Sequence, residues 1–181
     1  QRQMCIRDRS GKVLLTMFSQ NTNLLLAFLR DHNTARSVLD VFNDLYAMFG
    51  RETYCRLFPV ILTDRGSEFS NPVPIEQDEN DELRSLVFYC NPSAPYQKGG
   101  IEVAHELVRR VLPKGKSFDD LQQEDIDLML SHINSYKRGK LNSRSAYQLF
   151  NFIYGDDILP KLNIREIEAN DIVLSPKLLK K

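Results

Sequence analysis

The chain has 181 residues, 42% of them hydrophobic and 27% charged, which is enough apolar material for one compact domain with a packed core. Its 24 Lys and Arg balance 24 Asp and Glu, so no overall positive charge marks a nucleic-acid partner, and any argument for DNA depends on local charge. Three separated cysteines exclude a disulfide framework, and no apolar run reaches the roughly 18 residues of a membrane helix, so we expect a cytoplasmic protein without membrane contact.

The first nine residues, QRQMCIRDR, differ from the rest of the chain because they carry four charges and no usable periodicity. The string MCIRDR resembles translated sequencing-adapter sequence, and the alternative is a disordered native leader. We therefore expect residues 1–10 to be a non-native or disordered leader, residues 11–155 to form the folded core, and residues 156–181 to form a carboxyl-terminal tail.

The next elements follow from hydrophobic periodicity. Two apolar runs, residues 13–18 and 24–29, flank a polar turn and predict an antiparallel hairpin. Thr34 can cap a following helix, whose apolar residues recur at helical spacing until Gly50 closes it. Residues 59–62 form a short, continuously apolar run, which is typical of a buried parallel strand that leads to Asp64.

In the second half of the chain, apolar and polar residues alternate less regularly. Residues 86–90 predict another strand, and glycines and prolines then precede a helix over residues 101–112. Two further helices are predicted near residues 122–137 and 145–154. This order of strands and helices predicts an α/β fold with a mixed sheet.

Two carboxylates are candidates for chemistry. Asp64 follows a buried strand at the sheet edge where ligand sites of α/β proteins form, although an Asp-x-Gly turn is also common for backbone reasons. Glu102 opens a helix and shares its polar face with His105, Glu106 and Arg109. The alternative there is a solvated amphipathic helix whose first-turn Glu complements the helix dipole. Neither residue alone indicates a site.

Together, three strings are specific. LTDRGSEF (62–69), YQKGGIE (96–102) and RRVLPKG (109–115) resemble the insertion-sequence-thirty family of bacterial DDE transposases, within the superfamily of the retroviral integrases. HINSY (132–136) and SAYQL (145–149) resemble the closing region of the same family. The resemblance covers residues 11–150. It implies a ribonuclease-H-like mixed sheet flanked by helices, with carboxyl-terminal helices, and it makes Asp64 and Glu102 catalytic, metal-binding residues.

The chain departs from the family pattern at several positions. Gly100 stands where the family commonly has Ser, Ile101 and Val103 stand where Asn is common, and Ser145-Ala146 replaces Thr-Pro. The family's first Asp lies on a strand ahead of residue 13, where this chain has its unusual leader. We therefore expect an amino-terminally truncated core with the first strand missing or replaced, residues 1–9 outside the sheet, and no ligand role for Asp8.

The resemblance also implies a reaction and partners. The family hydrolyses a DNA phosphodiester and transfers the freed strand end, with two Mg²⁺ ions, or Mn²⁺, held by carboxylates. We expect transposon ends and target DNA as partners, a homo-oligomer on DNA, no small-molecule substrate, and a nucleoid-associated protein. Candidate phosphate contacts are Lys98, Arg109, Arg110 and Lys114, and a second basic cluster comprises Lys137, Arg138, Lys140 and Arg144.

Three functions stay open. The chain can be a transposase core, a non-catalytic remnant that only binds DNA or partner chains, or a nuclease without strand transfer, which the RRVLPKG string disfavours. His105 can orient Glu102 or contact DNA, or it can be an exposed histidine without a role. We expect the carboxyl groups of Asp64 and Glu102 to lie roughly 4–8 Å apart, and we expect little Mg²⁺-dependent cleavage if the first Asp is absent.

Overall fold

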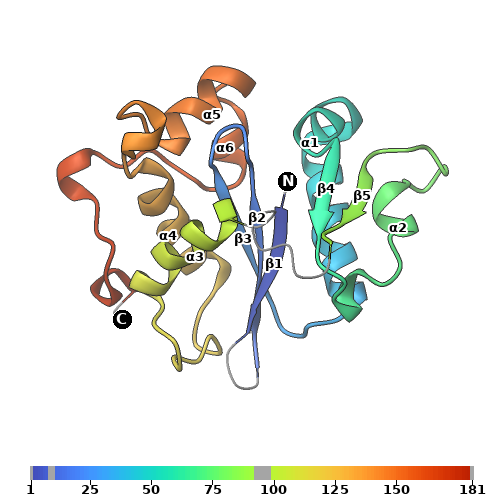
Figure 1. The fold of residues 1–181 in the computed structure, drawn as a ribbon, viewed down its shortest axis with the longest axis horizontal. Coiled ribbons are helices and arrows are strands. Elements are labelled where there is room, and N and C mark those ends of the chain that lie inside the picture. Colours follow the sequence, from blue (N-terminus) through green and yellow to red (C-terminus); the bar gives the residue numbers. More distant parts are fainter. Residues whose placement is uncertain (1, 8–10, 92–98, 180–181) are drawn as a thin grey trace.

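A five-stranded mixed sheet with the strand order β3-β2-β1-β4-β5 forms the centre of the protein (Figure 1). The computed structural model describes residues 2–7, 11–91 and 99–179. The strands are β1 (Arg2–Arg7), β2 (Val13–Phe18), β3 (Leu25–Arg30), β4 (Val60–Thr63) and β5 (Leu86–Tyr89). The helices are α1 (Ala35–Leu57), α2 (Val73–Glu76), α3 (Gly99–Val111), α4 (Gln123–Ser135), α5 (Ala146–Tyr154) and α6 (Ile158–Lys161).

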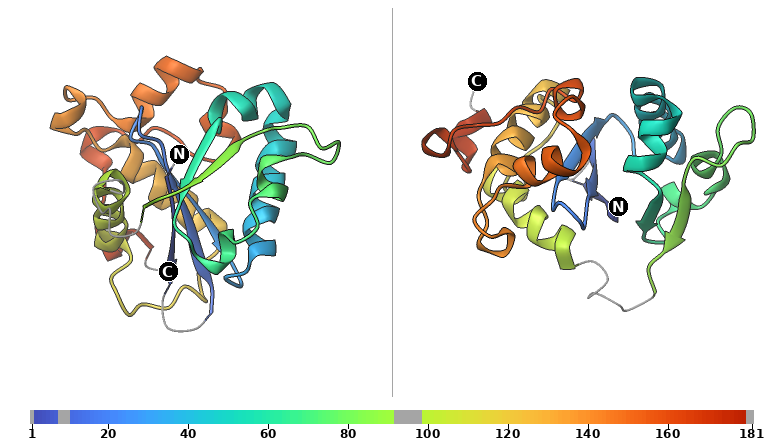
Figure 2. Two further views of the ribbon diagram at one scale, coloured as in Figure 1. Left: turned by 45° about the vertical axis from the view of Figure 1, so that its right-hand side comes forward. Right: turned by 90° about the horizontal axis from the view of Figure 1, so that it is seen from above.

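Helices cover the sheet on both sides. Helix α1 lies on one side, and α3 and α4 lie on the other (Figure 2). Strands β2 and β3 form the predicted antiparallel hairpin, and β4 and β5 pair in parallel. The sheet therefore contains both antiparallel and parallel pairs, which confirms the predicted α/β fold with a mixed sheet. Hydrophobic periodicity alone predicted four of the five strands and the long helices.

Helix α1 begins as predicted and ends later than predicted. The hydroxyl of Thr34 accepts a hydrogen bond from the backbone N–H of Ser37, and the two residues form a capping box. The helical backbone is interrupted at Gly50, as expected, but a second helical segment follows directly. Gly50 has a φ of 73°, which kinks the helix, and the helix then continues to Leu57. It continues because Tyr54 and Leu57 are buried in the core beyond the kink.

The expectation that residues 1–9 stay outside the sheet is wrong for Arg2–Arg7, which form the central strand β1. This strand pairs antiparallel with β2 along its whole length, and Arg2 pairs in parallel with Leu62 of β4. A first strand is therefore present, and it has the sequence of the unusual leader. Without it, β2 and β4 would each present a row of unpaired backbone groups, and backbone pairing does not require an apolar string. Asp8 lies outside the described residues.

Side chains are hydrogen bonded to backbone groups on both outer edges of the sheet. At the β3 edge, Asn134 accepts from the N–H of Leu25 at 2.9 Å and donates to its carbonyl at 2.8 Å. Gln123 does the same for two further groups of β3, accepting from Leu29 N at 2.8 Å and donating to Ala27 O at 3.1 Å. At the β5 edge, a Glu76 carboxylate oxygen accepts from Val87 N at 2.8 Å. These amide and carboxylate groups replace a neighbouring strand.

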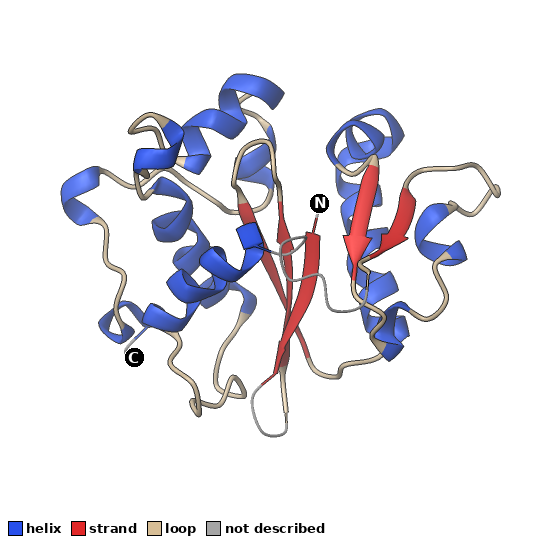
Figure 3. Cartoon of the chain, viewed as in Figure 1, coloured by secondary structure: helices blue, strands red, loops and turns tan. Residues whose placement is uncertain are grey.

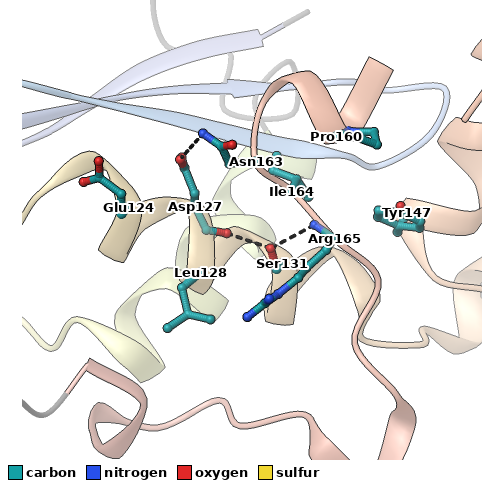
Figure 4. A pocket seen from close by; sticks show the side chains of 9 residues that line it. All are labelled: Glu124, Asp127, Leu128, Ser131, Tyr147, Pro160, Asn163, Ile164 and Arg165. Atoms are coloured by element: carbon teal, nitrogen blue, oxygen red, sulfur yellow. Dashed lines mark hydrogen bonds between the residues drawn. The ribbon is translucent and has the colours of Figure 1, made fainter. Parts of the chain in front are cut away.

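The chain after α5 runs through short helices and loops along α4 (Figure 3). Asp127, Ser131 and Ser135 are spaced four residues apart on α4 and receive hydrogen bonds from this segment. The donors are the Asn163 side chain and the backbone N–H groups of Arg165 and Ile167, and Figure 4 shows the first two contacts beside a pocket. The described residues contain no helix that is long and apolar enough to cross a membrane.

Candidate active site

Asp64 directly follows β4 and is half-buried. One of its carboxylate oxygens accepts a hydrogen bond from the backbone N–H of Gly66 at 3.3 Å, as in the Asp-x-Gly turn that the sequence suggested. Along β4, Ile61 and Thr63 are fully buried, whereas Val60 is exposed and Leu62 is half-buried. Because strand side chains alternate between the two faces, Asp64 continues the face of Val60 and Leu62.

Glu102 lies in the first turn of α3 and is exposed. The start of this helix packs closely on β2. A Cβ atom at Gly100 would approach the ring of Phe18 within 2.5 Å, and Phe18 is only 2% exposed. Glycine at this position therefore allows the close approach of α3 to Phe18.

His105 anchors the next turn of α3 to the same strand. Its Nε2 atom lies 2.8 Å from the hydroxyl of Thr16, which is fully buried. Burial, with a smaller effect from the nearby Arg109 guanidinium, lowers the pKa of His105 from 6.5 to about 4, so the ring is neutral at pH 7. The sequence did not identify this contact, because Thr16 lies in an apolar run and His105 lies on a polar helix face.

The strand register relates the two carboxylates. Phe18 of β2 pairs with position 2 of β1, and position 2 pairs with Leu62 of β4, so Phe18 and Leu62 lie level with each other. Paired positions present side chains to the same face, and α3 packs on that face at Phe18 and Thr16. Asp64 is on this face one step beyond Leu62. The strands that carry Phe18 and Asp64 are two strand spacings apart, roughly 10 Å.

This arrangement places Asp64 and the first turns of α3 at one end of the sheet and on one face. Along α3, Glu102 lies between Gly100 and His105, both of which approach β2 closely. Oxygen ligands of this kind suit Mg²⁺. The distance between the two carboxyl groups stays a prediction. Within the described residues, no group of three or more His, Cys, Asp or Glu side chains could hold a metal ion.

The position on β1 nearest to Asp64 also follows from the register. Position 2 pairs with Leu62, so position 4 is level with Asp64, and position 4 also pairs with Thr16. The sequence has Met at this position.

The expected phosphate contacts differ in their surroundings. Arg110 and Lys114 are exposed. Arg109 is half-buried, and its Nη1 atom is buried without a hydrogen-bond partner among the described residues. Lys98 lies outside the described residues. Arg110 and Lys114 are therefore the two of the four that the structure places in solvent, and Arg109 instead lies close enough to His105 to lower its pKa.

His105 leads to a testable pH dependence of stability. The unfolded chain binds a proton at His105 near pH 6.5 and the folded chain only near pH 4, so stability falls as the pH drops through this window. Between pH 7 and pH 5 we expect this group to remove about 2 kcal/mol from the free energy of unfolding. Urea denaturation at both pH values measures the loss.

The matched variant is His105→Gln, which keeps a polar group near Thr16 but does not titrate. The pKa of His132 is also lowered, mainly by burial, so some pH dependence should remain in this variant. If His105→Gln loses as much stability between pH 7 and pH 5 as the unchanged chain, the assignment of this pH dependence to His105 is wrong.

Comparison with known proteins gives consistent matches. No protein-family model matches the sequence. The chain is 28% identical over 137 residues to the ORF3 protein of Spiroplasma virus SpV1-R8A2 B, whose name marks it as a candidate integrase; the match covers 76% of this chain and 40% of that protein. It is 35% identical over 63 residues to the transposase of insertion sequence IS1086 from Cupriavidus metallidurans, covering 35% of this chain and 19% of the relative.

Solved structures show the same fold. The catalytic core domain of BIV integrase matches with a TM-score of 0.54 and 18% identity, covering 84% of this chain and 91% of that domain. A chain of the simian T-cell lymphotropic virus intasome, solved with a PP2A regulatory subunit, matches with a TM-score of 0.57 and 16% identity, covering 93% and 57%. The fold is therefore that of an integrase catalytic core, the ribonuclease-H-like mixed sheet that the sequence predicted. The chain spans less than half the length of the curated relatives it matches.

Proposed function

We propose that this chain, an integrase-like and transposase-like protein, is the catalytic core of a DNA transposase that hydrolyses a DNA phosphodiester and transfers the freed strand end. The observation that supports the proposal best is the common face and level of Asp64 and the first turn of α3. Asp64 and Glu102 come from sequence strings that resemble the transposase motifs, and Asp64 follows the carboxyl end of a parallel strand, where ligand sites of α/β proteins form.

Asp64 and Glu102 are the proposed metal ligands. Two Mg²⁺ ions, or Mn²⁺, would supply an activated nucleophile and stabilise the leaving oxygen of an in-line displacement. The Gly66 N–H donates a hydrogen bond to one Asp64 oxygen at 3.3 Å and so fixes the position of this carboxylate after β4. The contact of His105 with Thr16 holds the helix turn that follows Glu102, so we assign His105 a positioning role.

A second candidate function is a remnant that binds DNA or partner chains without catalysis. Met at position 4 of β1 favours it for this sequence, because that position is level with Asp64 and carries no carboxylate. Two divalent ions carry four positive charges, and two carboxylates neutralise this charge less well than three carboxylates would. We therefore propose that the chain as given cleaves DNA poorly, and that it acts as an oligomer with transposon ends and target DNA as partners.

DNA binding is the property that both candidate functions share. Arg110 and Lys114 are exposed at the carboxyl-terminal part of α3 and just beyond it, and phosphate contacts by such residues release counterions from DNA. We expect the double variant Arg110→Ala/Lys114→Ala to bind duplex DNA about 10-fold more weakly. It should also reduce the slope of log affinity against log salt by about 2. Fluorescence anisotropy at several salt concentrations measures both quantities.

The control changes two exposed lysines of the carboxyl-terminal tail, Lys161 and Lys177, to alanine, which removes the same charge elsewhere. If the control weakens binding as much as Arg110→Ala/Lys114→Ala, binding depends only on total charge and the DNA-binding assignment of α3 is wrong. If the unchanged chain binds no DNA at low salt, the proposed function is wrong in both forms.

A further inference from the structure

The two basic segments that lie apart in the sequence meet at one pocket of about 430 Å³. The pocket lies between one face of α3 along most of its length, the turn between β2 and β3, and the loop after α4. Its volume falls in the range of small-ligand sites, roughly 300–1,000 Å³. Its charged lining residues are Arg110, Lys137, Arg138, Lys140 and one acid, Glu106. Four cations against one carboxylate favour an anionic ligand.

The loop after α4 is fixed before any ligand binds. Lys137 and Ser145 form an isolated β-bridge, and the N–H of Arg138 donates to the carbonyl of Arg144 at 3.1 Å. The loop turns back through two consecutive left-handed residues, Asn142 and Ser143, with φ values of 52° and 60°. A loop already held in this form loses little further conformational entropy on binding.

Arg138 is an incompletely paired cation in this pocket. It is half-buried, and within the described part of the chain its guanidinium donates two long hydrogen bonds of 3.5 Å, to the carbonyls of Asn23 and Ile133. Its Nε atom is buried without a hydrogen-bond partner among the described residues, and no carboxylate of the described residues forms an ion pair with it. Burial lowers the pKa of Arg138. A phosphate oxygen would supply the missing charge-assisted hydrogen bonds.

The pocket also has apolar lining residues and an aromatic ring. Tyr136 is 40% exposed and Val103 is 49% exposed, and both line the pocket together with Leu107 and Leu141. An exposed ring beside several cations matches the way proteins hold an unstacked base and its phosphate. A base inside an intact duplex cannot present its face to such a ring, because its neighbours stack on it.

We propose that this pocket binds one unpaired nucleotide of a DNA strand, with its base against Tyr136 and its phosphate near Arg138. The inference rests on the proposed function, since that function makes DNA the ligand. Val103, which lines the pocket, directly follows Glu102 in α3, so the pocket and Glu102 share one helix.

The experiment compares two DNA probes on the full chain, without metal. One is a blunt duplex, and the other has the same sequence with a three-nucleotide unpaired end that carries 2-aminopurine. We expect the unpaired end to bind about 10-fold more tightly and to change the fluorescence of its 2-aminopurine, because one base stack contributes about 1–3 kcal/mol. Tyr136→Ala should abolish this preference while it changes blunt-duplex binding by less than about 2-fold. Arg138→Gln should weaken binding of the unpaired end.

Two further variants separate stacking from stability. Tyr136→Phe keeps the ring and should keep the preference, whereas Phe152→Ala removes an 81% exposed ring outside the pocket and should leave the preference unchanged. Equal affinity for both probes, or an equal loss for both in Tyr136→Ala, would overturn the inference and leave the proposed function standing. Binding of neither probe would overturn both.

Discussion

Replacing Met4 with aspartate is expected to tighten Mg²⁺ or Mn²⁺ binding by about 10-fold or more and to raise DNA cleavage from near background. Position 4 of β1 is level with Asp64 and pairs with Thr16, which His105 contacts. A carboxylate there would complete a set of three, so about one positive charge of two bound divalent ions would remain uncompensated instead of two. Calorimetric titration with Mn²⁺ and a nicking assay on plasmid DNA measure the two effects.

The control for charge is Gln20→Asp, which adds the same carboxylate in the exposed turn between β2 and β3. It should leave metal affinity unchanged. In the Met4→Asp background, Asp64→Asn and Glu102→Gln should each return binding and cleavage to the level of the unchanged chain. Strong cleavage by the unchanged chain that is insensitive to Asp64→Asn and Glu102→Gln contradicts the proposed mechanism.

Replacing Asn134 with alanine is expected to lower the free energy of unfolding by about 3 kcal/mol and the melting temperature by about 10 °C. Asn134 is fully buried, and its amide is hydrogen bonded to both backbone groups of Leu25. The alanine variant leaves one buried N–H and one buried carbonyl of β3 without this partner, and each costs about 1–3 kcal/mol. Urea denaturation and calorimetry measure the loss.

Asn21→Ala is the matched control, because Asn21 is exposed in the neighbouring turn and the same atoms are removed. It should change the free energy of unfolding by less than about 0.5 kcal/mol. If Asn134→Ala and Asn21→Ala destabilise the protein equally, the two hydrogen bonds to Leu25 do not hold α4 on β3.

The parts of the fold that the sequence predicted are those in which side chains carry the signal. The hairpin, β4 and α3 have strong hydrophobic patterns, and burial follows these patterns in the structure. Strand β1 has no such pattern. Its position in the sheet depends on backbone pairing with β2 and β4. Pairing between segments far apart in the sequence cannot be predicted from the six residues of one strand.

The candidate site divides in the same way. Asp64 and Glu102 were identified because both belong to strings that resemble a family. His105 and Thr16 are in contact although they are 89 positions apart in the sequence. In the pocket around Arg138, the contact of Arg138 with Asn23 joins residues that are 115 positions apart. The basic residues near Tyr136 were recognisable as a cluster, but only the fold shows that they share a pocket with α3.

The side chains bound at the edges of the sheet restrict how copies of this chain can join. On β3, the amides of Gln123 and Asn134 occupy backbone groups that an incoming strand would need, and on β5 the Glu76 carboxylate occupies the N–H of Val87. A continuous intermolecular sheet would first have to displace these side chains. Copies that gather on one DNA molecule would therefore contact one another through helices and loops. Each copy could then keep its own sheet, and the spacing of its carboxylates would not be changed by its neighbours.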